Sequence, residues 1–141
     1  SKNMPIDKNV PVPKNDEPMS DKNILVVEDE NDNFMYFKSV LAIYKVNVNV
    51  FRAENGLDAL EMIDSGINFH VILMDIKMPV MDGFEATKII KSKDPKQIVV
   101  AVTAFARSEE KRKFMEAGFD DYLAKPVKPN DLRQIIDKYL L

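Results

Sequence analysis

Short apolar runs alternate with amphipathic stretches along most of the chain, and this alternation limits the folds that it can adopt. The apolar runs cover residues 24–27, 46–51, 71–74, 98–102 and 122–124. The stretches that follow them have the apolar spacing of helices and cover residues 32–44, 55–65, 82–91, 108–117 and 131–140. Strands that are apolar at nearly every position are typical of a parallel sheet covered by helices on both faces. The pattern therefore predicts an α/β fold with a single doubly wound, five-stranded parallel sheet.

The segment 1–22 does not follow this pattern. It contains four of the eight prolines and no aromatic residue, and its lysines balance its acidic residues. Such a segment buries too little apolar surface to offset the entropy lost on ordering. We therefore expect a flexible linker or tail at 1–22 and one folded domain at 23–141. The linker, together with a serine at position 1, leads us to expect a piece of a longer protein.

Composition and charge exclude several classes of function. The chain has no cysteine and a single histidine, His70, so disulfides, thiolate or histidine-rich metal sites and a serine-protease triad are not expected. The net charge is −3, which argues against direct contact with nucleic acid. No apolar run approaches the about 20 residues of a membrane-spanning helix, so we expect no membrane contact.

Polar side chains stand at the ends of four of the five apolar runs. Glu28 and Asp29 follow the first run, Asp75 the third, Thr103 the fourth and Lys125 the fifth. Only the second run ends without a chemically suggestive residue. The carboxyl ends of parallel strands lie at one edge of the sheet, where ligands bind in such folds. We therefore expect these side chains to form one site.

The chemistry of these residues indicates a cation and a phosphoryl group. If the first and third strands are neighbours, Glu28, Asp29 and Asp75 repel one another unless a divalent cation lies between them. Oxygen ligands without His or Cys indicate Mg²⁺, with Mn²⁺ and Ca²⁺ as alternatives. Thr103 and Lys125 would then bind the oxygens of a phosphoryl group. Capping of the following helix is the alternative role for the first acids, but it explains Asp75 poorly.

Four motifs in this order resemble the receiver domains of the two-component response-regulator family, which have a CheY-like fold. They read ILVVEDE at 24–30, VILMDIKMPVMDG at 71–83, AVTA at 101–104 and YLAKP at 122–126. The resemblance extends over residues 23–141. It implies the strand order 2-1-3-4-5 and a phosphorelay function. The partner would be the dimerisation and phosphotransfer domain of a histidine kinase, or a histidine phosphotransfer protein.

The resemblance also implies a role for each site residue. Asp75 would be the phosphoacceptor that takes the phosphoryl group from phosphohistidine. Asp29, Asp75 and the backbone carbonyl of Lys77 would bind Mg²⁺, and Glu28 would assist. Such a domain switches conformation by its own phosphorylation and dephosphorylation. The parent protein would be a hybrid sensor histidine kinase with a C-terminal, cytoplasmic receiver, or else a stand-alone regulator.

The resemblance implies further roles for residues at and near the strand ends. Thr103 would follow the phosphoryl group, Lys125 would pair with it, and Tyr122 would move inward when Thr103 moves. The bond between Lys125 and Pro126 is usually cis in the family. Lys77 and Phe105 would tune the lifetime of the phosphoryl group, with simple surface variation as the alternative.

Two apolar residues begin the first predicted helix. Phe34 and Met35 fall off the core stripe that we assign to Phe37 and Leu41. We expect both to be solvent-exposed beside Asp75 and to form a docking surface for the phosphohistidine partner. Extra core is the alternative.

Three other functions share part of this pattern. A phosphohydrolase of the haloacid-dehalogenase type needs a second aspartate two residues after the first, where this chain has Lys77. A flavodoxin-like FMN-binding module needs a Ser/Thr- or Gly-rich phosphate loop after the first strand, where this chain has acids. A pseudo-receiver, an interaction module that does not take phosphate, remains the main alternative, although every residue required for phosphorylation is present.

Overall fold

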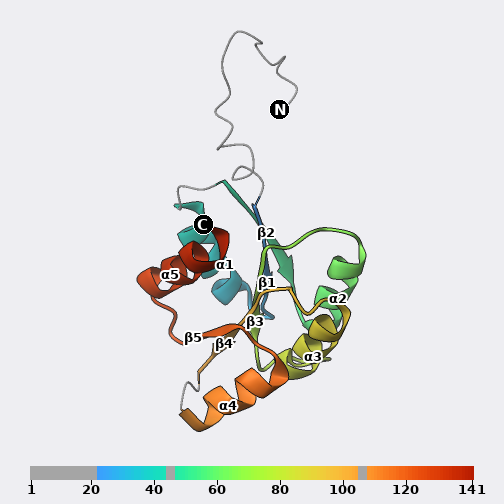
Figure 1. Cartoon of the computed structure of the whole chain (residues 1–141). Coiled ribbons are helices and arrows are strands. Elements are labelled where there is room, and N and C mark those ends of the chain that lie inside the picture. Colours follow the sequence, from blue (N-terminus) through green and yellow to red (C-terminus); the bar gives the residue numbers. More distant parts are fainter. Residues whose placement is uncertain (1–21, 44–46, 105–107) are drawn as a thin grey trace.

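The computed structural model describes residues 22–43, 47–104 and 108–141. In this part of the chain strands and helices alternate from end to end (Figure 1). The elements are β1 (Lys22–Val27), α1 (Asn31–Ala42), β2 (Val48–Ala53), α2 (Gly56–Asp64), β3 (Val71–Asp75), α3 (Gly83–Lys93), β4 (Val99–Thr103), α4 (Ser108–Ala117), β5 (Asp121–Ala124) and α5 (Pro129–Leu140). The predicted β/α alternation is confirmed.

The strands form one parallel sheet in the order β2-β1-β3-β4-β5. This is the order that the family resemblance implies. It makes β1 and β3 neighbours, with Val27 opposite Met74. The acids that follow β1 and the aspartate that ends β3 are therefore brought to the same edge.

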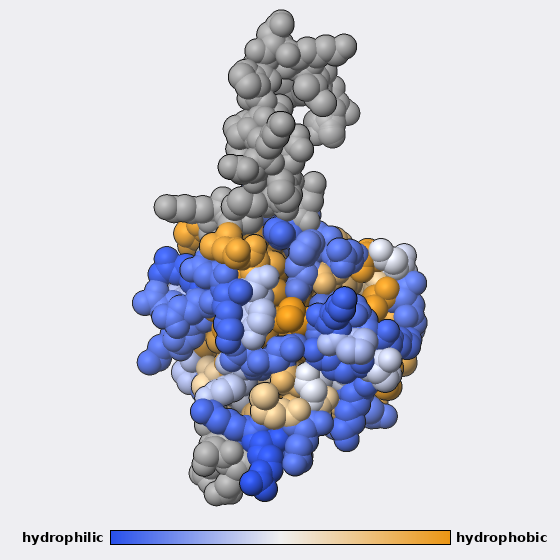
Figure 2. Space-filling view, in the orientation of Figure 1, coloured by the Kyte–Doolittle hydropathy of each residue, from blue (hydrophilic) through white to orange (hydrophobic). Residues whose placement is uncertain are grey.

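Helices cover both faces of the sheet, with α1 and α5 on one side and α2, α3 and α4 on the other (Figure 1). Alternate residues of the central strands point to opposite faces, so Leu25 and Val27 enter one apolar core while Ile24 and Val26 enter the other. This double burial is the reason why β1, β3 and β4 are apolar at nearly every position. On the face of the molecule shown in Figure 2, most surface residues are hydrophilic, and the apolar residues form separate small areas.

Local signals define several helix ends. The side chain of Asn55 accepts a hydrogen bond from the Asp58 N–H at the start of α2, and Asp82 caps α3 by the same geometry with the Glu85 N–H. Gly66 and Gly118, which lie shortly after the ends of α2 and α4, have φ values of +99° and +101°, which a side chain would strain.

The bounds of β2 are the part of the fold predicted least well. The strand covers Val48–Ala53 instead of 46–51, because it pairs with β1 from Lys22 opposite Val48 to Val27 opposite Ala53. Residues 44–46, which include the predicted end of a helix at 44 and the predicted start of this strand at 46, lie outside the described residues. The later end places Arg52 inside the strand.

The first strand begins at Lys22, one residue before the predicted domain start. The preceding residues 1–21 lie outside the described part, so the predicted linker is not tested. In the part of the chain that the structure describes, no helix has the length and apolar character needed to cross a membrane.

The contact between Gly83 and Asp75 leads to a prediction about packing. A Cβ at Gly83 would lie 2.2 Å from the carbonyl oxygen of Asp75, which is backbone and cannot move aside cheaply. We expect Gly83→Ala to lower the free energy of unfolding by about 2–3 kcal/mol, the cost of overpacking. It should also shift the amide resonances around Asp75. Denaturant unfolding and amide spectra measure the two effects.

Gly66→Ala is the matched control. A Cβ added at Gly66 would have no atom within 4 Å, but the positive φ of this residue would lower the free energy of unfolding by about 1 kcal/mol. It should leave the amide of Asp75 unchanged. Equal perturbation of Asp75 by both substitutions would contradict the proposed steric contact.

Candidate functional site

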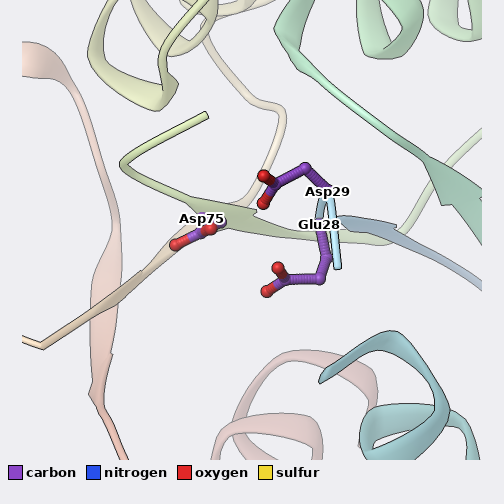
Figure 3. Close-up of side chains that lie close together, drawn as sticks. All are labelled: Glu28, Asp29 and Asp75. Carbon is purple, nitrogen blue, oxygen red and sulfur yellow. The ribbon is translucent and has the colours of Figure 1, made fainter. Parts of the chain in front are cut away.

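Three carboxylates converge at the carboxyl edge of the sheet. Glu28 and Asp29 follow β1 and Asp75 ends β3, and Figure 3 shows their carboxylates directed into a common space. One oxygen from each lies within 4.8 Å of the others. The fold therefore brings the three acids of the predicted cluster close together.

Glu28 is buried, which is unusual for an acid. Its Oε2 accepts hydrogen bonds from the Glu30 N–H at 3.1 Å and from Asn33 Nδ2 at 3.4 Å. Its Oε1 finds no hydrogen-bond partner in the described part of the chain. Burial raises the pKa of this carboxyl and the charge of Asp75 raises it further, while the Glu30 N–H lowers it.

Asp75 is also buried, and its Oδ1 accepts hydrogen bonds from Lys125 Nζ and from the Ile76 N–H, each at 2.9 Å. Burial raises the pKa of the Asp75 carboxyl above its ordinary range. Lys125 lowers the pKa of Asp75 through its hydrogen bond and its charge. The negative charge of Asp29 raises that pKa. The ammonium group of Lys125 thus compensates only part of the negative charge that meets here.

The remaining strand-end residues line the same cleft, which has a volume of about 720 Å³. Thr103 is buried at the end of β4, and its carbonyl accepts a hydrogen bond from the Lys125 N–H at 2.7 Å. Lys77 is exposed at the rim. The bond between Lys125 and Pro126 is cis, as the resemblance implies. The cleft is thus bounded by acids on one side and by an ammonium and a hydroxyl on the other.

The acidic cluster fits a hard divalent cation. It offers only oxygen donors, as Mg²⁺ prefers; the charge of Asp75 raises the pKa of Glu28, and the charge of Asp29 raises the pKa of Asp75. The buried Oε1 of Glu28, which has no hydrogen-bond partner among the described residues, is a further sign that protein groups satisfy this carboxylate only in part.

Tyr122 and Met35, two further predicted residues, do not line this cleft. Tyr122 is half-buried on β5, with Lys111 Nζ 5.0 Å from the centre of its ring. Met35 is 51% exposed, as expected. Phe105 lies outside the described residues.

The expectation that Phe34 is solvent-exposed is wrong. It is half-buried against the core on the α1 side, and the guanidinium carbon of Arg52 lies 5.1 Å from the centre of its ring. The physical reason is helical spacing: Phe34 precedes Phe37 by three residues and Leu41 by seven, and so shares their face.

Sequence reasoning missed three residues around the site. Asn33 donates hydrogen bonds to both Glu28 and Glu30. The hydroxyl of Tyr36 donates to the carbonyl of Val127 at 2.5 Å, which joins α1 to the loop that follows Lys125. Arg52 was not identified as a site residue because the second strand was predicted to end one residue before it.

Comparison with known proteins identifies the family. The family model for the response regulator receiver domain matches residues 24–137. Hybrid signal transduction histidine kinase L of Dictyostelium discoideum is 34% identical over 123 residues, which cover 82% of this chain but 7% of that protein. The chain thus spans a small part of the length of this curated relative.

Two solved structures show the same fold. The receiver domain of the Pseudomonas aeruginosa sensor histidine kinase PA1611, with a magnesium ion coordinated in its active-site cleft, is 30% identical with a TM-score of 0.75, covering 84% of this chain and 97% of that one. The receiver domain of Saccharomyces cerevisiae Ssk1, in complex with the histidine phosphotransfer protein Ypd1, is 32% identical with a TM-score of 0.78, covering 86% and 90%.

The chain therefore belongs to the response regulator receiver family. It is a receiver domain of the two-component type, homologous to the receivers of hybrid histidine kinases. The family and the CheY-like fold predicted from the four motifs are confirmed.

The raised pKa of Asp75 leads to a prediction about pH and stability. A carboxyl whose pKa is raised on folding binds its proton more tightly in the folded state, so stability falls as pH rises from its unfolded pKa through its folded pKa. Without divalent cations, Asp75→Asn should therefore be more heat-stable than the parent at pH 7. The difference should shrink as pH falls toward about 4, the ordinary pKa of an aspartate. Thermal unfolding across this pH range measures it.

Asp137→Asn, which removes an exposed carboxylate from α5, is the control and should change the unfolding temperature little. A parent protein that is more stable than Asp75→Asn at pH 7 would mean that the ion pair with Lys125 outweighs burial.

Proposed function

We propose that this domain accepts a phosphoryl group on Asp75 from a phosphohistidine and changes conformation as a result. The observation that supports this most directly is the meeting of Glu28, Asp29 and Asp75 in one cleft, with Lys125 already bonded to Asp75. Family membership supports the same role. The reaction forms a bond between an Asp75 oxygen and phosphorus and breaks the bond between phosphorus and the histidine nitrogen, which keeps the electron pair.

Mg²⁺ is the cation that we propose for the acidic cluster, held by Asp29, Asp75 and the backbone carbonyl of Lys77, with Glu28 assisting. Mn²⁺ suits the same donors. When bound, the cation offsets the negative charge of the incoming phosphoryl group. The cleft of the Pseudomonas receiver that contains magnesium supports this choice.

The protein's own residues supply orientation and charge. Lys125 is 2.9 Å from Asp75 and offers an ammonium to the phosphoryl oxygens without leaving the cleft. The hydroxyl of Thr103 lies at the end of the neighbouring strand and would donate to one of those oxygens. A phosphoryl group that binds Thr103 better in one of two conformations would favour that conformation, and Tyr122 would follow. Lys77 at the rim and Phe105 would tune the phosphoryl lifetime.

The partner that we propose is a histidine kinase phosphotransfer domain or a histidine phosphotransfer protein. The complex between the yeast receiver and Ypd1 supports such a partner. Similarity to hybrid kinases supports a place in the cytoplasmic part of a larger sensor kinase. Met35, exposed on the helix that begins beside the acidic cluster, would contribute to docking.

Phosphorylation of Asp75 is tested with a small donor. With Mg²⁺ and acetyl phosphate, intact-mass measurement should show one added phosphoryl group on the parent and none on Asp75→Asn. Thr103→Ala should still be modified, but the resonances of Tyr122 should no longer change. Equal labelling of Asp75→Asn would refute the assignment, and a parent that accepts no phosphoryl group from any donor would favour the pseudo-receiver.

Docking is tested by substituting Met35 alone, because Phe34 packs beneath Arg52 and its removal would disturb the site. Met35→Ala should slow transfer from a phosphohistidine partner about five- to tenfold, the effect of losing one interface contact of about 1 kcal/mol. Phosphorylation by acetyl phosphate should be unchanged, since a small donor needs no docking surface.

Met115→Ala is the matched control, because Met115 is an exposed methionine on α4. It should leave both reactions unchanged. If the small donor and the protein donor slow equally in Met35→Ala, the docking role is wrong.

A further inference from the structure

Arg52 connects the two ends of the loop that presents the acids. Its Nε donates to the carbonyl oxygen of Glu28 at 3.2 Å, and its Nη1 donates to Oδ1 of Asn31. Its guanidinium also lies over the ring of Phe34. Glu28 follows β1, whereas Asn31 and Phe34 belong to the first turn of α1.

We infer that Arg52 is a positioning residue that fixes the backbone of Glu28 and Asp29 for cation binding. This inference rests on the proposed function, because it concerns the same acidic cluster. It assigns no contact with the cation or the phosphoryl group to Arg52. The guanidinium acts on the backbone behind the acids, through the Glu28 carbonyl.

The loop needs such a constraint because its own charges oppose its conformation. Glu28 and Asp29 are adjacent in sequence and face Asp75, and the two buried carboxyls, Glu28 and Asp75, have raised pKa values. Without a bound cation, repulsion favours any movement that separates these groups. A bond from β2 to the Glu28 carbonyl restrains that movement, since β2 is itself paired with β1 along its length.

The geometry requires a guanidinium and not merely a positive charge. A planar fork can donate in two directions while its face lies against an aromatic ring, whereas an ammonium is a single point of donation. Arg52 Nη2 is buried without a hydrogen-bond partner among the described residues. The group is therefore held by packing against Phe34 and by its two acceptors, at the cost of one unsatisfied donor.

A purely electrostatic role for Arg52 makes the opposite prediction. A fixed positive charge close to the acids would compete with a divalent cation, so its removal would strengthen cation binding. Under the positioning role, removal weakens binding, because the acids must then be ordered when the cation binds. The sign of the change therefore separates the two roles.

The experiment measures Mg²⁺ affinity by titration calorimetry, with the Asp29 amide resonance as a second signal. Arg52→Met should weaken binding about tenfold or more, as is typical when a residue that orients metal ligands is lost. Arg52→Lys, which keeps the charge, should weaken it nearly as much. Arg133→Met removes a guanidinium from the exposed surface of α5 and should change the affinity little.

Asn31→Ala removes one acceptor of Arg52 without touching the core, and it should weaken binding in the same direction but less. This variant keeps the test decisive if Arg52→Met fails to fold. Tighter Mg²⁺ binding in Arg52→Met, or full affinity in Arg52→Lys, would overturn the positioning role. Full affinity in Asn31→Ala would also overturn it.

The failure of this inference is distinguishable from the failure of the proposed function. A parent protein that binds Mg²⁺ no better than Asp29→Asn would overturn the proposed cation site and this inference with it. A parent that binds in an Asp29-dependent manner, alongside Arg52 variants of equal affinity, would overturn the role of Arg52 alone.

Discussion

Repulsion among buried carboxylates is the constraint around which the rest of the site is arranged. Glu28 and Asp75 are both buried; the charge of Asp75 raises the pKa of Glu28, and the charge of Asp29 raises the pKa of Asp75. In water such groups would separate or bind a counter-ion, but here the sheet holds them in place. The ammonium of Lys125 and the amide of Asn33 relieve part of this repulsion. The binding of a divalent cation can relieve the repulsion that these two groups leave uncompensated.

The fold can impose this arrangement because the acids stand at the ends of two central strands. β1 and β3 are neighbouring central strands, buried on both faces, and their apolar side chains fill two separate cores. Behind Asp75 the backbone of Gly83 approaches so closely that no side chain fits. The free energy gained by apolar burial thus offsets the electrostatic repulsion among the carboxylates of the site.

The acidic loop and the proposed docking surface are physically continuous. Phe34 packs on the core and under Arg52, while its neighbour Met35 is exposed to solvent. Arg52 in turn bonds to the carbonyl of Glu28. A partner that presses on this turn of α1 would therefore act on side chains that contact the backbone of the acidic loop.

Much of this protein follows from local sequence alone. Apolar runs define the strands because a strand buried on both faces has no polar side. The residue that ends each strand defines the site edge, because parallel strands share a direction, so Asp29, Asp75 and Lys125 could be assigned to one site. The strand order, by contrast, came from family resemblance, since no local pattern states which strands are neighbours.

Only the tertiary structure decided which side chains meet across elements. Strand pairing set the end of β2 and so brought Arg52 to the loop after β1. The same guanidinium lies over the ring of Phe34, which helical spacing places against the core on the α1 side. The bond of Lys125 to Asp75 spans fifty residues of sequence. Such contacts depend on distances that folding creates, and for these no periodicity along the chain provides a signal.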